Sequence, residues 1–155
     1  AISDSPRTRD PLHRRSTHWH GAGLDVELMD VEARSLLGLH DFLTFCKPRE
    51  GATTIRELQD FRFARDDRGL VIARLRADAF CHNMVRALVG CLIAIGEGRR
   101  PPEWAADVLT RRTRGAGVTV VHAHGLTWEE VGYPEGAELA AQAARARATR
   151  EPLHG

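Results

Sequence analysis

The longest apolar run of the chain, from Met84 to Gly96, contains a single charged residue, Arg86. At helical spacing Met84, Leu88 and Leu92 share one face, and the remaining positions are also largely apolar. A helix that is apolar on nearly all sides is a buried helix, so the pattern predicts one over residues 82–96. A buried guanidinium stays protonated and needs an anion beside it. Because no acidic residue lies three or four positions from Arg86, we expect its partner to come from elsewhere in the fold, another domain or a ligand such as a phosphate.

Polar and apolar positions upstream of this run predict a helix followed by a β-hairpin. Residues 24–38 have apolar side chains at helical spacing, with Asp25 as N-cap and Gly38 as the C-terminal stop. Residues 53–66 and 70–78 alternate between apolar and charged positions around the turn at 66–69, with an irregularity near Glu57, as in two paired strands. We expect a short strand at 15–20 and loops at 1–13 and 40–51.

The chain after the apolar run is predicted to be less regular. Residues 102–113 begin with proline and end with arginines, which is typical of a helix. Residues 125–134 resemble a strand that Pro134 ends. Residues 136–150 favour a helix but carry few large apolar side chains, so we expect a loosely docked tail.

The predicted element order, β-α-β-β-α-(α)-β, indicates an α+β fold. We expect an antiparallel sheet with helices packed on one face, in the split βαβ order of ferredoxin-like domains. The other face is left free, and such faces bind RNA or another sheet. The length of 155 residues suits one domain with a modest core.

The overall charge says little about binding partners, but the positions of the basic residues along the chain say more. The 22 basic residues nearly balance the 21 acidic ones, and Lys47 is the single lysine. Guanidinium groups match phosphate geometry well. They cluster in three places, at Arg7, Arg9, Arg14 and Arg15, at Arg99 and Arg100, and at Arg111, Arg112 and Arg114. A solvated surface remains an equal alternative for each cluster.

The residues that could perform chemistry form no recognised catalytic or metal-binding motif. His18 and His20, and His122 and His124, are HxH pairs that could chelate a metal on a strand, but no third and fourth ligands follow. Cys81 at a helix start could be a nucleophile, although a packed small residue is the simpler interpretation. We therefore expect no metal and no cofactor.

Cysteine usage and hydropathy indicate where the protein works. Three cysteines without CxxC spacing fit poorly with a disulfide framework, so we expect reduced thiols and a cytoplasmic protein without a signal peptide. The apolar run is shorter than the roughly 20 residues of a membrane span, and no membrane partner is expected. A start at Ala1 suggests a piece of a longer or processed protein.

Three stretches together resemble a known family in order and spacing. They are LLGLHDFLTFC (36–46), ADAFCHNMVRALVGCLIAIGEGRRPPEW (77–104) and AHGLTWEEVGYP (123–134). They are similar to the C-terminal domain of the TruA family of bacterial tRNA pseudouridine synthases, of an Arg-rich type. The resemblance covers residues 1–134 and leaves an Ala/Arg-rich tail at 135–155. The sequence departs from the family at Val121-His122, where members often have Ala-Pro.

This resemblance implies one half of a pseudouridine synthase fold and a tRNA substrate. The family isomerises uridines of the tRNA anticodon stem-loop, at tRNA positions 38 to 40, without cofactor or metal, and its members are dimers. Its catalytic aspartate lies in a GRTDxGVH motif of the N-terminal domain, and this sequence contains no such motif. The resemblance therefore implies an incomplete enzyme that is inactive alone and needs the missing N-terminal catalytic domain.

The resemblance also assigns roles to residues around the apolar helix. Arg86 would pair with the catalytic aspartate, while Phe80, Met84 and Val85 would wall the pocket. Asp41, Phe42 and Phe45 would form a structural loop beside it. The side chains expected to contact RNA are Arg14, Arg15, Arg99, Arg100 and His82.

Two alternative functions remain open at this point. The chain could be a stand-alone RNA-binding α+β module that has lost catalysis. It could also be a thiol-dependent or metal hydrolase, which would depend on Cys81 and the HxH pairs.

Overall fold

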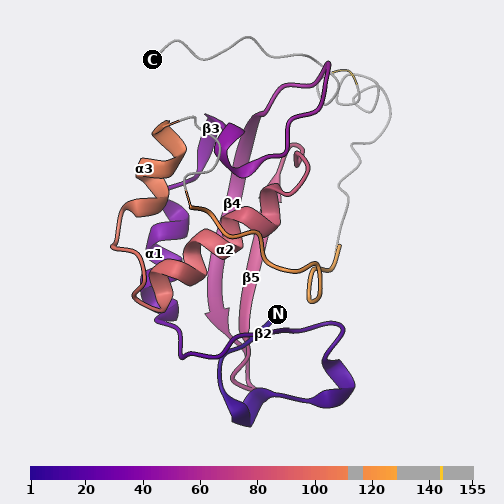
Figure 1. Cartoon of the computed structure of the whole chain (residues 1–155), viewed down its shortest axis with the longest axis vertical. Coiled ribbons are helices and arrows are strands. Elements are labelled where there is room, and N and C mark those ends of the chain that lie inside the picture. Colours follow the sequence, from indigo (N-terminus) through magenta and orange to yellow (C-terminus); the bar gives the residue numbers. More distant parts are fainter. Residues whose placement is uncertain (112–116, 129–143, 145–155) are drawn as a thin grey trace.

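The computed structural model describes residues 1–111, 117–128 and 144, and these form an α+β fold with helices on one face of a sheet (Figure 1). The described strands are β1 (Ile2–Ser3), β2 (His18–Trp19), β3 (Gly38–Asp41), β4 (Ile55–Arg65) and β5 (Val71–Ala77). Their order in the sheet is β2-β1-β5-β4-β3. Neighbours are antiparallel except β1 and β2, which are parallel, so the predicted fold class is confirmed with a mixed rather than purely antiparallel sheet.

Three α-helices and three short 3-10 turns complete the described chain. They are α1 (Val26–Arg34), α2 (Met84–Gly96), α3 (Trp104–Arg111), η1 (Pro6–Thr8), η2 (Pro11–His13) and η3 (Leu43–Phe45). Helix α1 packs on β4 and against α2, while α3 packs against η3 and α2. Within the ranges that the structure describes, none of the helices is both long enough and apolar enough to cross a membrane.

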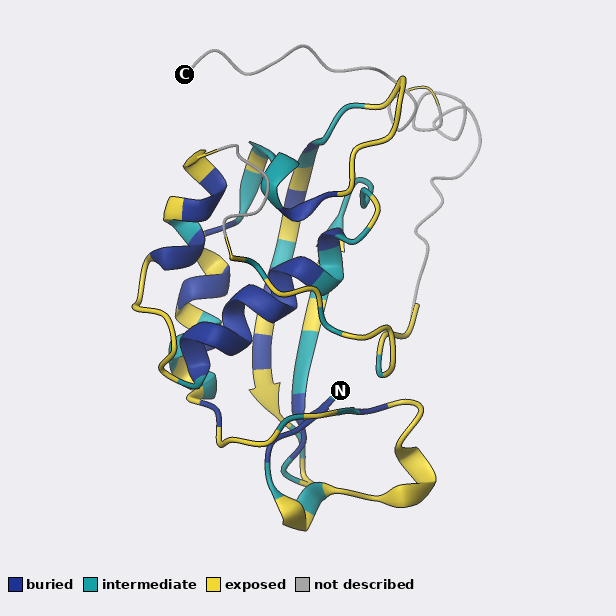
Figure 2. Ribbon diagram, in the orientation of Figure 1, coloured by how far each residue is buried: buried dark blue, intermediate teal, exposed yellow. Residues whose placement is uncertain are grey.

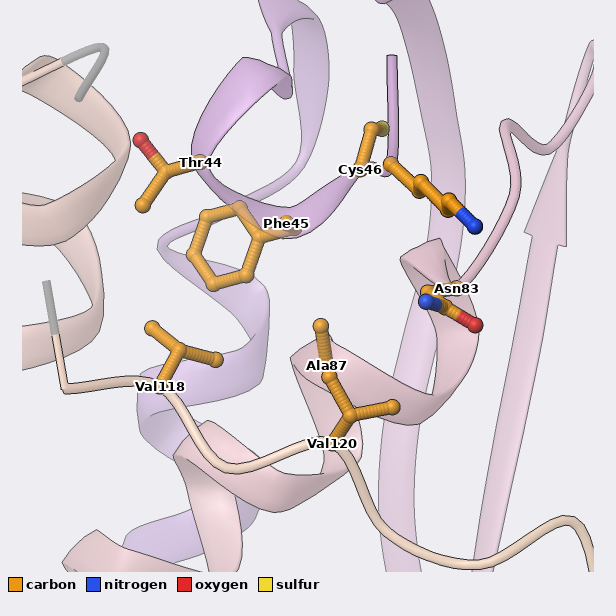
Figure 3. Close-up of a pocket in the computed structure, with 8 residues that line it drawn as sticks. Thr44, Phe45, Cys46, Asn83, Ala87, Val118 and Val120 are labelled. Carbon is orange, nitrogen blue, oxygen red and sulfur yellow. The ribbon is translucent and has the colours of Figure 1, made fainter. Parts of the chain in front are cut away.

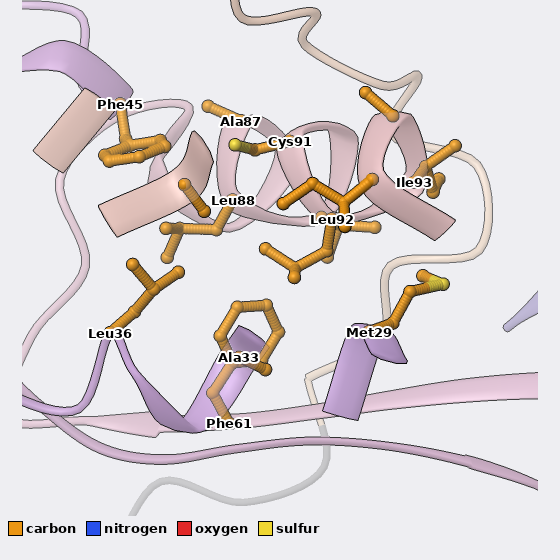
Figure 4. Packing of buried hydrophobic residues seen from close by; sticks show 14 of the residues in the cluster. Met29, Ala33, Leu36, Phe45, Phe61, Ala87, Leu88, Cys91, Leu92 and Ile93 are labelled. Atoms are coloured by element: carbon orange, nitrogen blue, oxygen red, sulfur yellow. The ribbon is translucent and has the colours of Figure 1, made fainter. Parts of the chain in front are cut away.

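The core lies between α2, α1 and the inner face of the β4–β5 hairpin. Leu88 and Leu92 of α2, Ala33 of α1 and Phe61 of β4 have no exposed surface, and Phe61 points from its strand toward the helices (Figure 4). Burial of a large apolar side chain stabilises a fold by about 1.5–3 kcal/mol. Figure 2 shows that α2 is buried along most of its length, which confirms the predicted buried helix.

The predicted hairpin is confirmed, and its turn explains the pairing of β4 with β5. Asp66 Oδ1 accepts hydrogen bonds from the backbone N–H groups of Arg68 and Leu70, and Gly69 adopts a φ of 82° that suits glycine. The irregularity expected near Glu57 lies between Leu58 and Asp60, where the pairing register shifts.

The predicted start of α1 is confirmed, but its predicted end is wrong. Asp25 Oδ1 accepts a hydrogen bond from the Leu28 N–H at 3.0 Å, as an N-cap does. The helix stops at Arg34, four residues before Gly38. Gly38 has a φ of 110° and begins β3 instead, because this conformation lets the chain turn directly into the sheet edge.

The short strand predicted at 15–20 is present as β2 at one edge of the sheet, but sequence patterns missed β3 at the other edge and β1 between β2 and β5. Strand β3 extends from the end of the predicted 24–38 helix into the predicted 40–51 loop, and β1 lies within the predicted 1–13 loop. Two- and four-residue strands carry too few positions to show alternation. In the predicted 125–134 strand, residues 125–128 are not in a strand, with Trp128 70 % exposed. Residues 129–134 and the predicted 136–150 helix, apart from residue 144, lie outside the described residues.

Residues 117–121, which we call the crossing segment, run across α2 (Figure 1). Its backbone approaches the helix so closely at Gly90 that a Cβ there would collide with the Thr119 carbonyl oxygen. The Val121 N–H donates to the Arg86 carbonyl at 3.3 Å. Glycine at position 90 is therefore required for this segment to lie against α2.

A partly buried ion pair connects the residue after β1 to the end of β4. Both carboxylate oxygens of Asp4 accept hydrogen bonds from Arg65, at 3.0 and 2.6 Å, and Oδ2 also accepts one from the Leu24 N–H. The Asp4 side chain is only 4 % exposed. The bonds from Arg65 hold the pKa of Asp4 below its usual value. The pair therefore joins β1, β4 and the segment that precedes α1.

We expect Asp4→Asn to lower the free energy of unfolding by about 1–3 kcal/mol at pH 7, because it leaves Arg65 facing a neutral amide. The loss should be smaller than for a fully buried pair, since the Arg65 side chain is 42 % exposed. A carboxyl group whose pKa is lower in the folded than in the unfolded protein stabilises the fold at pH values above its ordinary pKa. This stabilisation is lost as pH falls through the pKa of the folded state. Urea unfolding should therefore show the difference between the two proteins shrinking as pH falls below the ordinary aspartate pKa of about 3.9. The exposed Asp67→Asn variant is the control, and a difference that grows in acid would contradict the assignment.

We expect Gly90→Ala to destabilise the fold by about 1–3 kcal/mol through overpacking. The sign of the change in the free energy of unfolding is informative, because helix propensity alone would make alanine more stable than glycine by about 1 kcal/mol. Hydrogen exchange should show faster exchange of the Val121 amide. Gly96→Ala is the matched control: its added Cβ would meet the Met29 side chain instead. Equal exchange at Val121 in both variants would contradict the role of Gly90.

Candidate functional site

The site is organised around residues 79–83, which lead into α2. Asn83 adopts a left-handed backbone conformation (φ 68°), which asparagine tolerates better than most residues, and it redirects the chain into the helix. Its side chain makes no N-cap hydrogen bond. The Lys47 N–H donates to the His82 carbonyl at 2.9 Å and joins this segment to the end of η3. The helix start is thus held by tertiary contacts rather than by a side-chain cap.

Arg86 projects from the first turn of α2 and is half-buried rather than fully buried, which corrects the sequence-based expectation. Its Nε donates to the Val121 carbonyl at 2.6 Å, and one terminal nitrogen donates to Asn83 Oδ1 at 3.3 Å. Within the part of the chain that the structure describes, no carboxylate forms an ion pair with it. The two bonds orient the guanidinium but leave its charge without a counterion there.

A pocket of about 190 Å³ lies next to this arginine, between η3, α2 and the crossing segment (Figure 3). Its lining consists of Thr44, Phe45, Cys46, Lys47, Asn83, Ala87, Val118 and Val120. Asn83 belongs to both features, since it lines the pocket and bonds to Arg86. The pocket therefore lies beside the arginine but is not lined by it.

The three apolar residues predicted to wall the site differ in burial. Phe80 and Val85 are half-buried, and the Phe80 ring packs edge-on against Trp128 with ring centroids 5.9 Å apart. Met84 has no exposed surface and belongs to the core. Phe80 and Val85 thus keep some accessible surface, whereas Met84 has none.

The five predicted RNA-binding residues do not gather at one place. His82 is exposed at the N-terminal end of α2, whereas Arg99 and Arg100 follow its C-terminal end. A 13-residue helix spans about 20 Å. Arg100 lies over the Trp104 ring, 4.7 Å from its centroid, and Arg99 pairs with Glu97. Arg14 and Arg15 are exposed just after η2.

The two HxH pairs, separate in the sequence, lie near each other. Burial lowers the pKa of His18 most, and the nearby charges of His20, His122 and His124 lower it further. His20 is in turn hydrogen-bonded to Glu97 at 2.7 Å. Among the residues that the structure describes, no group of three or more histidine, cysteine or carboxylate side chains is arranged to hold a metal ion.

The expectation that all three cysteines are reduced thiols is wrong for two of them. Cys46 and Cys81, 35 positions apart, form a disulfide. Only the fold brings them together, because Cys46 ends η3 and Cys81 precedes α2. Cys91 is free and buried in α2, and burial raises its pKa to about 12.

The loop at 41–45 has the structural character predicted for it. Asp41 Oδ1 accepts hydrogen bonds from the Leu43 N–H and the Thr54 hydroxyl. Phe42 and Phe45 are buried in the core. Sequence reasoning missed two contributors to the site, Asn83 and the Val121 carbonyl. Asn83 carried a signal, as a residue that tolerates left-handed backbone directly before a helix, whereas a backbone carbonyl carries none.

Comparison with known proteins identifies the family of this chain. Residues 33–134 match the tRNA pseudouridine synthase family. The chain is 52 % identical over 150 residues to tRNA pseudouridine synthase A of Streptomyces griseus, covering 96 % of this chain and 53 % of that protein. It is 52 % identical to the protein of that name from Frankia casuarinae, covering 97 % and 55 %, and 46 % identical to that from Mycobacterium leprae, covering 96 % and 52 %. The chain thus spans about half the length of these curated relatives. By sequence similarity over most of its length, this chain belongs to the tRNA pseudouridine synthase family.

Proposed function

We propose that this chain is the C-terminal half of a TruA-type tRNA pseudouridine synthase, which isomerises uridine to pseudouridine in the tRNA anticodon stem-loop. In this proposal residues 1–134 form the domain and residues 135–155 a tail. The match to about half of each relative supports it, as does the lack of a GRTDxGVH motif in the sequence. The catalytic aspartate then comes from the other half of the enzyme, and this chain alone is incomplete.

The observation that carries the proposal is the state of Arg86. A guanidinium has five N–H donors, and two hydrogen bonds to uncharged oxygens hold it in the described residues. Nε is committed to the Val121 carbonyl, so a carboxylate would bind end-on to the two terminal nitrogens. Such charge-assisted bonds are among the strongest in proteins. Arg86 is therefore a preoriented cation that fits one carboxylate.

This pairing has a direct chemical consequence for an aspartate. An arginine beside a carboxyl group lowers its pKa and keeps it ionised, and only the ionised form acts as a nucleophile or general base. The fixed guanidinium also restricts the orientation of the carboxylate. In the proposed enzyme Arg86 holds and orients the catalytic aspartate.

The surroundings of Arg86 suit a nucleobase. Phe80 and Val85 offer half-buried apolar surface, and stacking of a base on an aromatic ring contributes about 1–3 kcal/mol. The pairing of Ile2 with Val71 carries β1 antiparallel to β5, so a preceding segment of the enzyme would run alongside β5. The missing half would thereby join the sheet close to the site.

The partners we propose are tRNA, the N-terminal half that supplies the aspartate, and a second copy of the enzyme in a dimer. Arg14, Arg15 and His82 are exposed and available to phosphates, while Arg99 and Arg100 would contact RNA at the other end of α2. A tRNA-modifying enzyme of this kind works in the cytoplasm without metal or cofactor. The exposed arginines also favour the alternative, a stand-alone RNA-binding module without catalysis.

We expect no pseudouridine formation by this chain alone on unmodified tRNA, because it supplies no catalytic aspartate. Fusion to the part of Streptomyces griseus tRNA pseudouridine synthase A that it does not match should restore activity. The measurement is release of tritium from tRNA labelled at C5 of uridine. Filter binding of tRNA by the chain alone, weakening as salt rises, would accompany either function. Product formation by the isolated chain, or a folded fusion that binds tRNA without turnover, would contradict the proposal.

In the same fusion, we expect Arg86→Met to lower kcat/KM by about 100- to 5,000-fold, which corresponds to the roughly 3–5 kcal/mol lost when a buried pair loses one partner. Arg86→Lys should recover part of the rate, since it keeps the charge but not the bidentate geometry. Arg68 is exposed in the hairpin turn, so the kcat/KM of the Arg68→Met variant should remain within about twofold of that of the parent fusion. Turnover of Arg86→Met close to that of Arg68→Met would refute the pairing.

A further inference from the structure

The disulfide between Cys46 and Cys81 lies directly beside the proposed active-site arginine. Its two Cα atoms are 5.7 Å apart, within the usual range for a disulfide. Cys46 ends η3 and lines the pocket, and Cys81 is part of the segment that leads into α2. The bond therefore connects the pocket wall to the backbone that positions Arg86.

Non-covalent contacts hold the same two segments together. The Lys47 N–H donates to the His82 carbonyl at 2.9 Å, one residue beyond each cysteine. The Thr44 hydroxyl donates to the Val108 carbonyl at 3.3 Å and anchors η3 on α3. These contacts do not depend on the oxidation state of sulfur. The two thiols of the reduced protein would consequently stay within reach of each other.

The three cysteines differ in accessibility, so that thiol–disulfide exchange is expected only at Cys46 and Cys81. Cys81 is half-buried and lies two residues before Asn83, the N-cap of α2. Cys46 is 6 % exposed, so Cys81 is the sulfur that a reagent reaches first. Cys91 is enclosed in the core, where burial raises its pKa to about 12 and removes its reactivity.

The start of α2 is where a covalent link would have the largest effect. Asn83 is in the left-handed conformation and forms no side-chain cap, so few local interactions define the helix start. The described contacts at the helix start are the backbone bonds from Met84 to Cys81 and from Ala87 to Asn83, the bond from Lys47 to His82, the bonds of Arg86 with Asn83 and Val121, and the disulfide. Opening the disulfide removes the one covalent member of this set.

We propose that Cys46 and Cys81 are a reversible thiol–disulfide pair that fixes the start of α2, and with it Arg86, when oxidised. The reagents are a low-molecular-weight thiol and its disulfide. The Cys81 thiolate attacks the small disulfide and releases one thiolate; Cys46, after losing its proton, attacks the mixed disulfide and releases the second. The reversibility rests on the proposed function, because an enzyme that works in the reducing cytoplasm rarely keeps a permanent structural disulfide.

The test uses the chain equilibrated in glutathione buffers of graded oxidised-to-reduced ratio, then acid-quenched, alkylated and mapped by mass spectrometry. We expect the Cys46–Cys81 link in oxidising buffer, two alkylated thiols in reducing buffer, and full reversal between them without unfolding. Cys91 should remain unmodified by glutathione throughout. Amides of residues 80–87 should exchange several-fold more slowly in the oxidised form.

Matched variants separate the link from other effects of oxidation. In Cys46→Ser, Cys81 should take up a single glutathione, and exchange at residues 80–87 should no longer depend on the buffer; Cys81→Ser provides a second unlinked variant. Cys91→Ala should keep the redox response. The proposal is overturned if both cysteines stay reduced or carry separate glutathiones at every ratio. A link that resists reduction in the folded protein, or equal exchange in both redox forms, would overturn it as well. None of these readouts depends on tRNA modification.

Discussion

The burial of α2 is the constraint on which the rest of the described structure depends. From Ala87 to Gly96 every residue of this helix is buried, so it needs apolar contacts around its whole circumference. Helix α1 packs on one side, where Phe61 of β4 joins the same core, while η3 and α3 pack against α2 elsewhere. The crossing segment closes the remaining side, which is possible because Gly90 has no side chain. The sheet, the other helices and the crossing segment are thus arranged around the apolar helix α2.

The same constraint places the charge of Arg86. An arginine in the middle of α2 would have lost its hydration without recovering it. In the first turn it is half-buried and receives two oriented acceptors, the Val121 carbonyl and Asn83 Oδ1. The crossing segment therefore has two roles: it completes the apolar enclosure of α2 and directs the guanidinium. In the proposed enzyme, this arrangement would orient Arg86 toward the carboxylate supplied by the other half.

The predictions from sequence succeeded where a long periodic pattern was present. The β4–β5 hairpin, the cap at Asp25 and the buried helix all depend on contacts between residues close in the chain, and each was identified. Strands β1 and β3 were missed, because their pairing is decided by neighbours distant in the sequence; the equally short β2 was predicted from its β-branched and aromatic residues rather than from a period. Of the strand expected at 125–134, the described residues 125–128 pair with no other strand, although Leu126 and Trp128 alternate as in a strand.

In the candidate site, too, some features follow from the local sequence and others only from tertiary contacts. The sequence by itself determined that one arginine would lie in an apolar helix without an acidic neighbour, since this follows from helical spacing alone. Only the tertiary structure decided what surrounds that arginine. The Val121 carbonyl is 35 positions away, and the disulfide joins cysteines separated by the same number of residues. Local periodicity reports which side of a helix is apolar, but contacts between distant segments are decided by how the whole core packs.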